Sequence, residues 1–226
     1  MSCRIRAIVF DFDGVILESL DIKTRAFVEL FRDHPEHHEA IARHHLENAG
    51  VSRYEKFRWI HEELLGCELD LAASARLGDT FSEIVYREIL TCPFVEGAEA
   101  FLRAAAGRYL LFVASGTPEQ ELRDIVARRG LASLFTAIEG TPRTKGAIIR
   151  DLMAGHGLKT DEVVFVGDAL ADMEGARESG VGFIARVPAG EESIFLPGSA
   201  IATVADLAEL DARWPEIVGA AEVASR

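Results

Sequence analysis

The sequence has few cysteines, no long apolar run and no excess of positive charge, and each absence excludes a class of protein. Its three cysteines, Cys3, Cys67 and Cys92, are widely spaced and form no metal-binding pattern, which is typical of a protein kept reduced in the cytoplasm. No apolar run approaches the roughly 18–20 residues of a membrane span, and the N-terminus shows no signal peptide. We therefore expect a cytoplasmic protein that does not enter a membrane.

The charge balance is acidic, with a formal net charge of −13 over 226 residues. Nucleic acid is therefore an unfavourable partner, because its phosphates attract a basic surface. A small phosphorylated molecule is compatible with this charge, because a bound divalent cation and one lysine reverse the local field. With 49% apolar residues, the chain can build one large domain, or one domain with a smaller one inserted. The oligomeric state is left open.

Apolar, strand-like runs recur along the chain with helical segments between them. They are Ile5–Phe10, Tyr109–Ala114, Leu134–Ile138, Val163–Val166 and Gly182–Ala185. This alternation predicts an α/β fold, a Rossmann-like parallel sheet with helices on both faces.

The interval between the first two runs is too long for a single crossover helix. Apolar residues recur there at helical spacing, and Ile22, Ala26 and Phe27 form one such face. We therefore predict an α-helical cap subdomain at residues 16–92. It is inserted into a core formed by residues 1–15 and 93–226.

Two aspartates, Asp11 and Asp13, follow the first apolar run and precede Gly14. The carboxyl ends of parallel strands are where α/β sheets bind ligands. Alternation along an extended chain points both side chains the same way, and two such charges need a cation or a shared proton. The alternative interpretation is a solvated acidic turn.

A hydroxyl-containing cluster, Ser115-Gly116-Thr117, follows the second run. A hydroxyl and free backbone N–H groups before a helix suit an anion. The alternative is that Thr117 only caps a helix in which Pro118 is the first residue.

A lysine and two more aspartates follow the next two runs. Lys145 precedes a predicted helix, Asp168 directly follows the fourth run, and Asp172 lies one turn further on. Each has a structural alternative, since single lysines are commonly solvated and carboxylates stabilise the first turn of a helix. The order favours function, because parallel strands bring all four clusters to one edge of the sheet.

This order of clusters resembles the four motifs of the haloacid dehalogenase-like hydrolase superfamily, and in particular its phosphoglycolate phosphatase and β-phosphoglucomutase-like subgroup with a helical cap. The resemblance covers Ile5 to Gly182. It implies that Asp11 is a nucleophile, that Asp13 is a general acid/base, and that Lys145 neutralises the phosphoryl group.

The resemblance also implies a substrate site and a Mg²⁺ cofactor. Ser115, with Gly116 and Thr117 beside it, would contact the phosphoryl group. The implied metal ligands are the Asp11 side chain, the Asp13 carbonyl, Asp168 and Asp172. We further expect Lys145 to hold Asp11 ionised, and the acidic, desolvated surroundings of Asp13 to raise its pKa.

The choice of reaction depends on Asp13, because dehalogenating and phosphonate-cleaving relatives lack an acid at this position. The segment Gly50-Val51-Ser52-Arg53 resembles the substrate-specificity loop of β-phosphoglucomutase, but Lys23 stands where that mutase has a histidine. We therefore expect a Mg²⁺-dependent phosphatase, a phosphoric monoester hydrolase that acts on a small phosphorylated metabolite through an aspartyl phosphate. Arg53 and Lys23 are its expected cap-borne substrate contacts. The alternatives are a sugar phosphomutase and a non-catalytic binding protein, with Arg53 as an exposed helix-start residue.

Histidines cluster in the predicted cap. They are His34, His37, His38, His44 and His45. Clustered imidazoles can bind transition metals, but charged neighbours favour a solvated polar face.

Overall fold

The computed structural model describes residues 5–224, so Cys3 and the outermost residues of the predicted core, 1–4 and 225–226, lie outside the described residues. Within this range the strands form one parallel six-stranded sheet in the order β3-β2-β1-β4-β5-β6. The strands are β1 (Ala7–Phe10), β2 (Leu110–Pro118), β3 (Ala137–Thr141), β4 (Val163–Gly167), β5 (Gly182–Arg186) and β6 (Ala202–Val204). The predicted α/β fold is confirmed.

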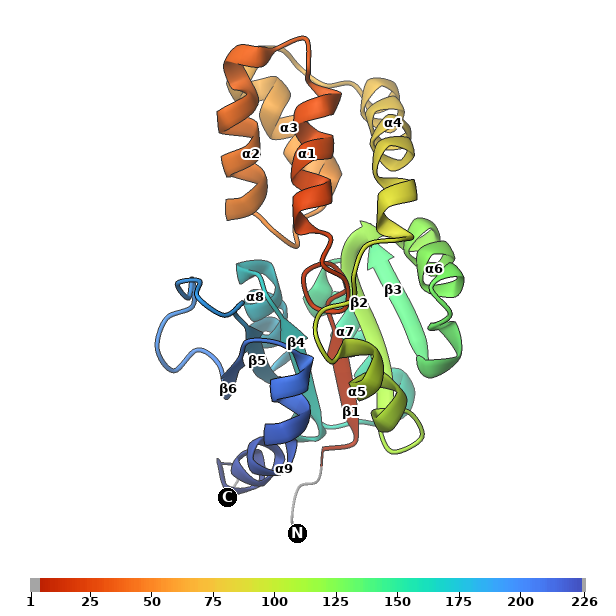
Figure 1. Cartoon of the computed structure of the whole chain (residues 1–226), viewed down its shortest axis with the longest axis vertical. Coiled ribbons are helices and arrows are strands. Elements are labelled where there is room, and N and C mark those ends of the chain that lie inside the picture. The colour runs from red at the N-terminus through yellow and green to blue at the C-terminus, as the bar shows by residue number, and fades with distance from the viewer. Residues whose placement is uncertain (1–4, 225–226) are drawn as a thin grey trace.

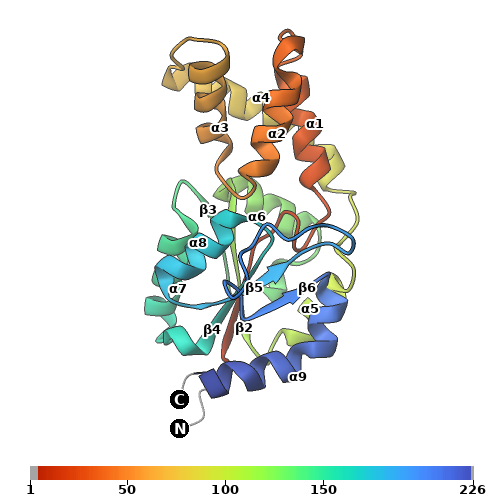
Figure 2. The ribbon, with the colours of Figure 1, turned by 90° about the vertical axis from the view of Figure 1, so that its left-hand side faces the viewer.

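Helices cover both faces of the sheet (Figures 1 and 2). One face carries α5 (Ala98–Ala105), α6 (Glu119–Arg128) and α9 (Leu207–Ala224), and the other carries α7 (Lys145–His156) and α8 (Leu170–Ser179). Every residue of β1 and β4 is buried, as expected for central strands with both faces covered. Alternate residues divide between two apolar cores, with Phe10 in one and Val9 in the other.

A separate group of helices lies above the carboxyl ends of the strands (Figure 1). It contains α1 (Leu20–Leu30), α2 (His38–Glu47), α3 (Arg53–Trp59) and α4 (Leu71–Ile89), with the one-turn segments η1 (Pro35–His37) and η2 (Ile60–Leu64). All lie inside the segment predicted as the cap. Phe27 packs at their centre, with its ring centroid 5.7 Å from that of Phe57 and 4.6 Å from that of Phe81.

Two connecting segments join the cap helices to the core and pair with each other. The Glu18 amide donates to the Pro93 carbonyl at 3.0 Å, and the Val95 amide donates to the Ile16 carbonyl at 3.0 Å. The chain therefore leaves and re-enters the core at one place, directly beside the end of β1.

Three details differ from the sequence-based expectations. The predicted run 134–138 becomes a strand only at Ala137, because residues before it form the 3₁₀ turn η3 (Ala132–Leu134). The edge strand β6 was not predicted, since three residues carry too little pattern. Another 3₁₀ turn, η4 (Thr160–Glu162), precedes β4. No helix in residues 5–224 has the length and apolarity needed to cross a bilayer.

Candidate active site at the carboxyl edge of the sheet

An acidic group surrounds Lys145 at the ends of β1 and β4. Lys145 begins α7, and its Nζ lies 3.0 Å from Asp11 Oδ2 and 2.5 Å from Asp172 Oδ1. These three side chains are buried. Because β1 and β4 are hydrogen-bonded neighbours, Asp168 at the end of β4 reaches the same place. The sheet thus brings together residues from three distant parts of the sequence, as predicted.

The carboxylates of this group fit a divalent cation. One oxygen from each of Asp11, Asp168 and Asp172 lies within 4.8 Å of the others, and the buried Asp11 Oδ1 has no hydrogen-bond partner. Three carboxylates facing one lysine leave an excess of negative charge, and carboxylate oxygens are ligands that Mg²⁺ prefers.

The pKa shifts show the same charge excess. Burial and the charge of Asp172 raise the pKa of Asp11 to about 7, although Lys145 opposes this rise, so the expectation that Lys145 holds Asp11 ionised is wrong. Burial, together with Asp172 and Asp11, also raises the pKa of Asp168 well above its ordinary value. Burial alone would lower the pKa of Lys145, but Asp11 and Asp172 raise it. Burial and the mutual repulsion of the carboxylates together therefore outweigh the attraction of the single lysine.

Asp172 has a second set of partners that distinguishes it from Asp11. Its Oδ2 accepts hydrogen bonds from the backbone amides of Asp168 at 3.2 Å and Ala169 at 3.0 Å, while Oδ1 contacts Lys145. Asp172 therefore stabilises the start of α8, as the structural alternative anticipated, and also holds Lys145 in place.

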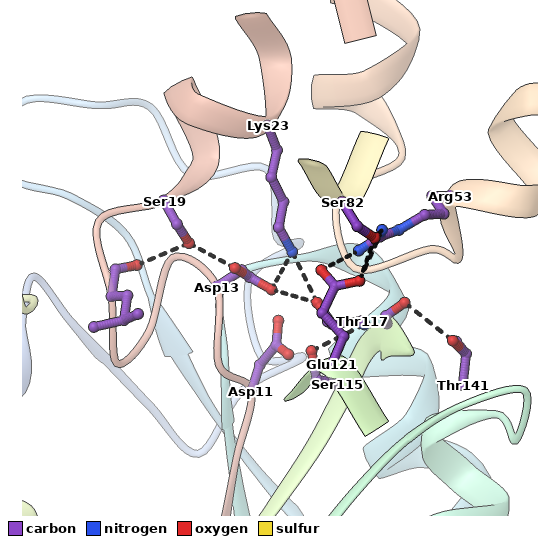
Figure 3. Close-up of polar contacts among 12 residues, drawn as sticks. Asp11, Asp13, Ser19, Lys23, Arg53, Ser82, Ser115, Thr117, Glu121 and Thr141 are labelled. Carbon is purple, nitrogen blue, oxygen red and sulfur yellow. Dashed lines mark hydrogen bonds and ion pairs between the residues drawn. The ribbon is translucent and has the colours of Figure 1, made fainter. Parts of the chain in front are cut away.

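Asp13 lies in a different environment, formed largely by the cap (Figure 3). Its Oδ1 accepts from Ser19 Oγ at 2.6 Å, and its Oδ2 pairs with Lys23 Nζ and accepts from Thr117 Oγ1 at 3.0 Å. Burial would raise the pKa of Asp13, but the charge of Lys23 and the hydrogen bonds from Lys23, Ser19 and Thr117 lower it. The expected rise is therefore wrong, because the cap supplies a cation.

The hydroxyl cluster lies at the end of β2. Thr117 Oγ1 also accepts from Lys23 Nζ at 2.9 Å, and α6 begins only at Glu119. Thr117 is therefore a contact of Asp13 and not a helix cap. Ser115 is buried, and a Cβ on Gly116 would lie 2.5 Å from the Gly50 carbonyl oxygen. Glycine at position 116 thus lets the cap loop approach the sheet edge.

Arg53 is buried, so it is not an exposed helix-start residue. Its guanidinium donates to Glu121 Oε1 at 2.8 Å and Oε2 at 3.0 Å, and to Ser82 Oγ at 2.7 Å, as Figure 3 shows. Glu121 belongs to α6 of the core, so the side chain joins cap to core. The sequence did not identify Glu121, because this partner of Arg53 comes from a different part of the chain and only the fold brings the two together.

Asp11 and the residues around Asp13 line a common cavity of about 40 Å³. Its polar lining residues are Asp11, Asp13, Lys23, His45, Arg53, Lys56, Ser115 and Thr117. Sequence reasoning missed Lys56, although it follows Arg53 by three residues and so shares its helix face.

His45 was expected on a solvated face, and this is wrong, because it is buried beside Lys56. His44 stacks on Trp59 with centroids 3.6 Å apart. Within the described residues, the cluster that could hold a metal contains no histidine.

Three comparisons place this architecture among known proteins. The family model described as haloacid dehalogenase-like hydrolase matches residues 8–186. The chain is 27% identical over 188 residues to a phosphoglycolate phosphatase of Synechococcus elongatus, covering 78% of this chain and 81% of that protein. It is 28% identical over 189 residues to a 5'-nucleotidase of Pseudomonas aeruginosa, covering 78% and 80%. A β-phosphoglucomutase structure from Clostridium difficile matches the fold with a TM-score of 0.75 at 16% identity, covering 98% of this chain and 100% of that one.

Proposed function

The chain belongs to the haloacid dehalogenase-like hydrolase family, and we propose that it is a Mg²⁺-dependent phosphatase of a small phosphorylated metabolite. The observation that carries the proposal is the pairing of Asp11 with Lys145 in a buried acidic group, next to a separate carboxylate, Asp13, held by hydroxyls and a lysine. Two carboxylates in different environments suit two different roles. The names of the similar proteins, phosphoglycolate phosphatase and 5'-nucleotidase, support hydrolysis of phosphate esters.

Asp11 is the proposed nucleophile. Its unpartnered Oδ1 attacks phosphorus and the alcohol leaves, which gives an aspartyl phosphate that water hydrolyses in a second step. Lys145 is placed to offset charge on the transferring group, and Ser115 and the amides of Gly116 and Thr117 are the proposed donors to its oxygens. Mg²⁺, when held by Asp11, Asp168, Asp172 and the Asp13 carbonyl, would add positive charge at the phosphoryl oxygens.

Asp13 is the proposed acid/base. Its pKa is lowered in the present arrangement, so Asp13 is in the form that takes a proton from the attacking water in the second step. Donation to the leaving alcohol in the first step requires the protonated carboxyl, so Asp13 must take up a proton before that step, and it regains one from the attacking water in the second step. Ser19 and Thr117 fix its orientation from two sides.

The competing functions are less well supported. A sugar phosphomutase would use Arg53 for a distal phosphate, but Glu121 already engages both terminal nitrogens of Arg53. A non-catalytic binding protein would have no need for the unpartnered, buried oxygen of Asp11.

The experiment is phosphate release from a panel of phosphomonoesters with Mg²⁺. Asp11→Asn should lower the rate at least about 10³-fold, because removal of a nucleophile leaves only binding and electrostatic contributions. Asp21→Asn, on the exposed start of α1, should match the wild type. Absence of phosphate release from every compound would contradict the proposal. Conversion of a β-sugar 1-phosphate to its 6-phosphate faster than hydrolysis would favour the mutase.

A further inference from the structure

Arg186, the last residue of β5, is a buried cation outside the proposed catalytic residues. Its side chain is 6% exposed, and each of its three nitrogens has an acceptor. Nε donates to the Ala205 carbonyl oxygen at 3.0 Å, and Nη1 donates to the Gly14 carbonyl oxygen at 3.1 Å. Nη2 donates to Glu18 Oε1 at 2.7 Å, and Nη1 lies 3.4 Å from Glu18 Oε2. One side chain thus binds both ends of the segment 14–18, which joins β1 to the cap (Figure 1).

Gly14 lies between Arg186 and the acidic group. Its φ of +75° is one that glycine adopts without strain, and a Cβ on it would lie 2.1 Å from Asp168 Oδ2. The Gly14 amide donates to the Leu17 carbonyl oxygen at 2.8 Å, and the peptide plane of this amide also contains the Asp13 carbonyl. Because that carbonyl is a proposed Mg²⁺ ligand, the position of Gly14 decides where it stands relative to the Asp168 carboxylate.

Glu18 lies where the chain leaves the core for the cap. Its amide donates to the Pro93 carbonyl oxygen of the returning segment at 3.0 Å. The next residue, Ser19, donates to Asp13 Oδ1 at 2.6 Å. The contact between Glu18 and Arg186 therefore fixes the point from which the cap starts and, through Ser19, supports the carboxylate of Asp13.

We propose that Arg186 is a positioning residue for the reaction: by holding Gly14 and Glu18, it places the Asp13 carbonyl at the metal site and the start of the cap beside it. This inference rests on the proposed phosphatase function. A guanidinium suits the role, because its donors form a rigid fork that can hold several acceptors at once. Arg186 contacts none of the proposed reacting groups, so its effect is transmitted through the segment 14–18.

Calorimetric titration of Mg²⁺ into the protein separates positioning from charge. Arg186 is close enough to Asp168 for its positive charge to act on that carboxylate, so loss of the charge alone would tighten Mg²⁺ binding. Loss of positioning should weaken it. We expect Arg186→Met to bind Mg²⁺ at least about 10-fold more weakly than the wild type, as is typical when a group that orients a metal ligand is removed.

Arg186→Lys is the second variant, and it decides the question if Arg186→Met does not fold. It keeps the charge but loses the fork, so it should also weaken Mg²⁺ binding. Unchanged or tighter binding in Arg186→Met, or wild-type binding in Arg186→Lys, would overturn the proposal.

Glu18→Gln tests the cap end of the contact. Two amides bond across the connecting segments, those of Glu18 and Val95, and they should exchange hydrogen about fivefold faster in this variant, because a contact of a partly exposed pair is lost. Glu99→Gln is the matched control, since Glu99 is 45% exposed against 42% for Glu18 and pairs with Arg103 at the same 2.7 Å. It should leave both amides unchanged. Equal exchange in the two variants would overturn the role of Arg186 at the cap.

Neither measurement needs a substrate, so this inference and the proposed function can fail separately. If no ester is hydrolysed but Arg186→Met weakens Mg²⁺ binding, the phosphatase proposal fails and the positioning role stands. If an ester is hydrolysed and Arg186→Met keeps the wild-type Mg²⁺ affinity, the positioning role fails and the phosphatase proposal stands. A wild type that binds no Mg²⁺ would overturn both.

Discussion

The two halves of the site, the core half and the cap half, carry opposite charge. The core half gathers three carboxylates, Asp11, Asp168 and Asp172, around a single lysine. In the cap half, Lys23 pairs with Asp13, whereas Lys56 has no carboxylate within 4.0 Å among the described side chains. Each half therefore carries charge that its own side chains do not compensate, negative in the core half and positive in the cap half. The core half would be completed by a cation and the cap half by an anion, so the metal and the substrate would approach the reacting carboxylate from opposite sides.

The largest effect on activity should come from removing one carboxylate of the core half. Asp168→Asn should lower Mg²⁺-dependent phosphate release about 10³-fold, since it removes a proposed metal ligand. It should also abolish the rise in Tm that Mg²⁺ gives the wild type, because ligands that bind only the folded state stabilise it. Without Mg²⁺ the variant should be the more stable protein, because burial and the charges of Asp172 and Asp11 disfavour ionised Asp168.

Differential scanning calorimetry with Mg²⁺ and with a chelator measures this difference. The matched control is Asp151→Asn on α7, whose side chain is 67% exposed. That variant should retain the full Mg²⁺-dependent shift. If Asp168→Asn also retained the shift, the acidic core half would not be a metal site. The excess negative charge of that half would then not be compensated by a bound cation.

The same division separates what the sequence could predict from what it could not. Asp11, Lys145 and Asp168 stand at strand ends, and parallel pairing brings strand ends to one edge whatever the details of packing. Their proximity, the α/β fold and the inserted helices were therefore predictable. The pKa directions were not, because they depend on burial and on distances within the group.

The cap half depended on tertiary contacts without a sequence signature. Arg53 was identified only through a resemblance to a known loop, and Lys23 only through its position in the first cap helix. Their observed partners, Glu121 and Asp13, became evident only in the structure. Lys56 was not identified, because a lysine on a helix is ordinarily solvated. In the structure it lies against His45 of α2 and Phe27 of α1, contacts that form only when the cap helices pack together.

A smaller effect, on stability, is expected at the ion pair between Arg53 and Glu121, which joins the cap to the core. Glu121→Gln should lower the free energy of unfolding by about 3 kcal/mol, because it leaves the buried Arg53 guanidinium without a counter-charge. Glu99→Gln is a matched control, since Glu99 pairs with Arg103 at a similar distance, 2.7 Å against 2.8 Å, but in solvent. Its cost should be at most about 1 kcal/mol. Urea unfolding measures both, and equal costs would show that the Arg53 pair is no tighter than a surface contact.

The smallest effect on stability is expected from Lys56→Met. It should raise the free energy of unfolding, whereas Glu121→Gln should lower it. Burial first, then the positive charges of Lys23 and Lys145, lower the pKa of Lys56 in the folded state to about 7 from 10.5. Asp13 and Glu55 oppose this shift only partly. Lys56→Met should therefore stabilise the protein by roughly 1–2 kcal/mol at pH 6.5, because a similar apolar side chain replaces a buried charge.

The pH dependence of that gain identifies its cause. Between pH 7 and 10.5 the unfolded chain keeps the Lys56 proton and the folded chain has lost it, so wild-type stability rises with pH across this window. Below pH 7 both states are protonated and the folded state bears the full cost. The advantage of Lys56→Met should thus be greatest below pH 7 and shrink towards pH 10, whereas Lys159→Met, at an exposed site, should show no such trend in urea unfolding. An advantage that did not change with pH would show that burial does not lower the pKa of Lys56, and the cap half would then carry no uncompensated positive charge.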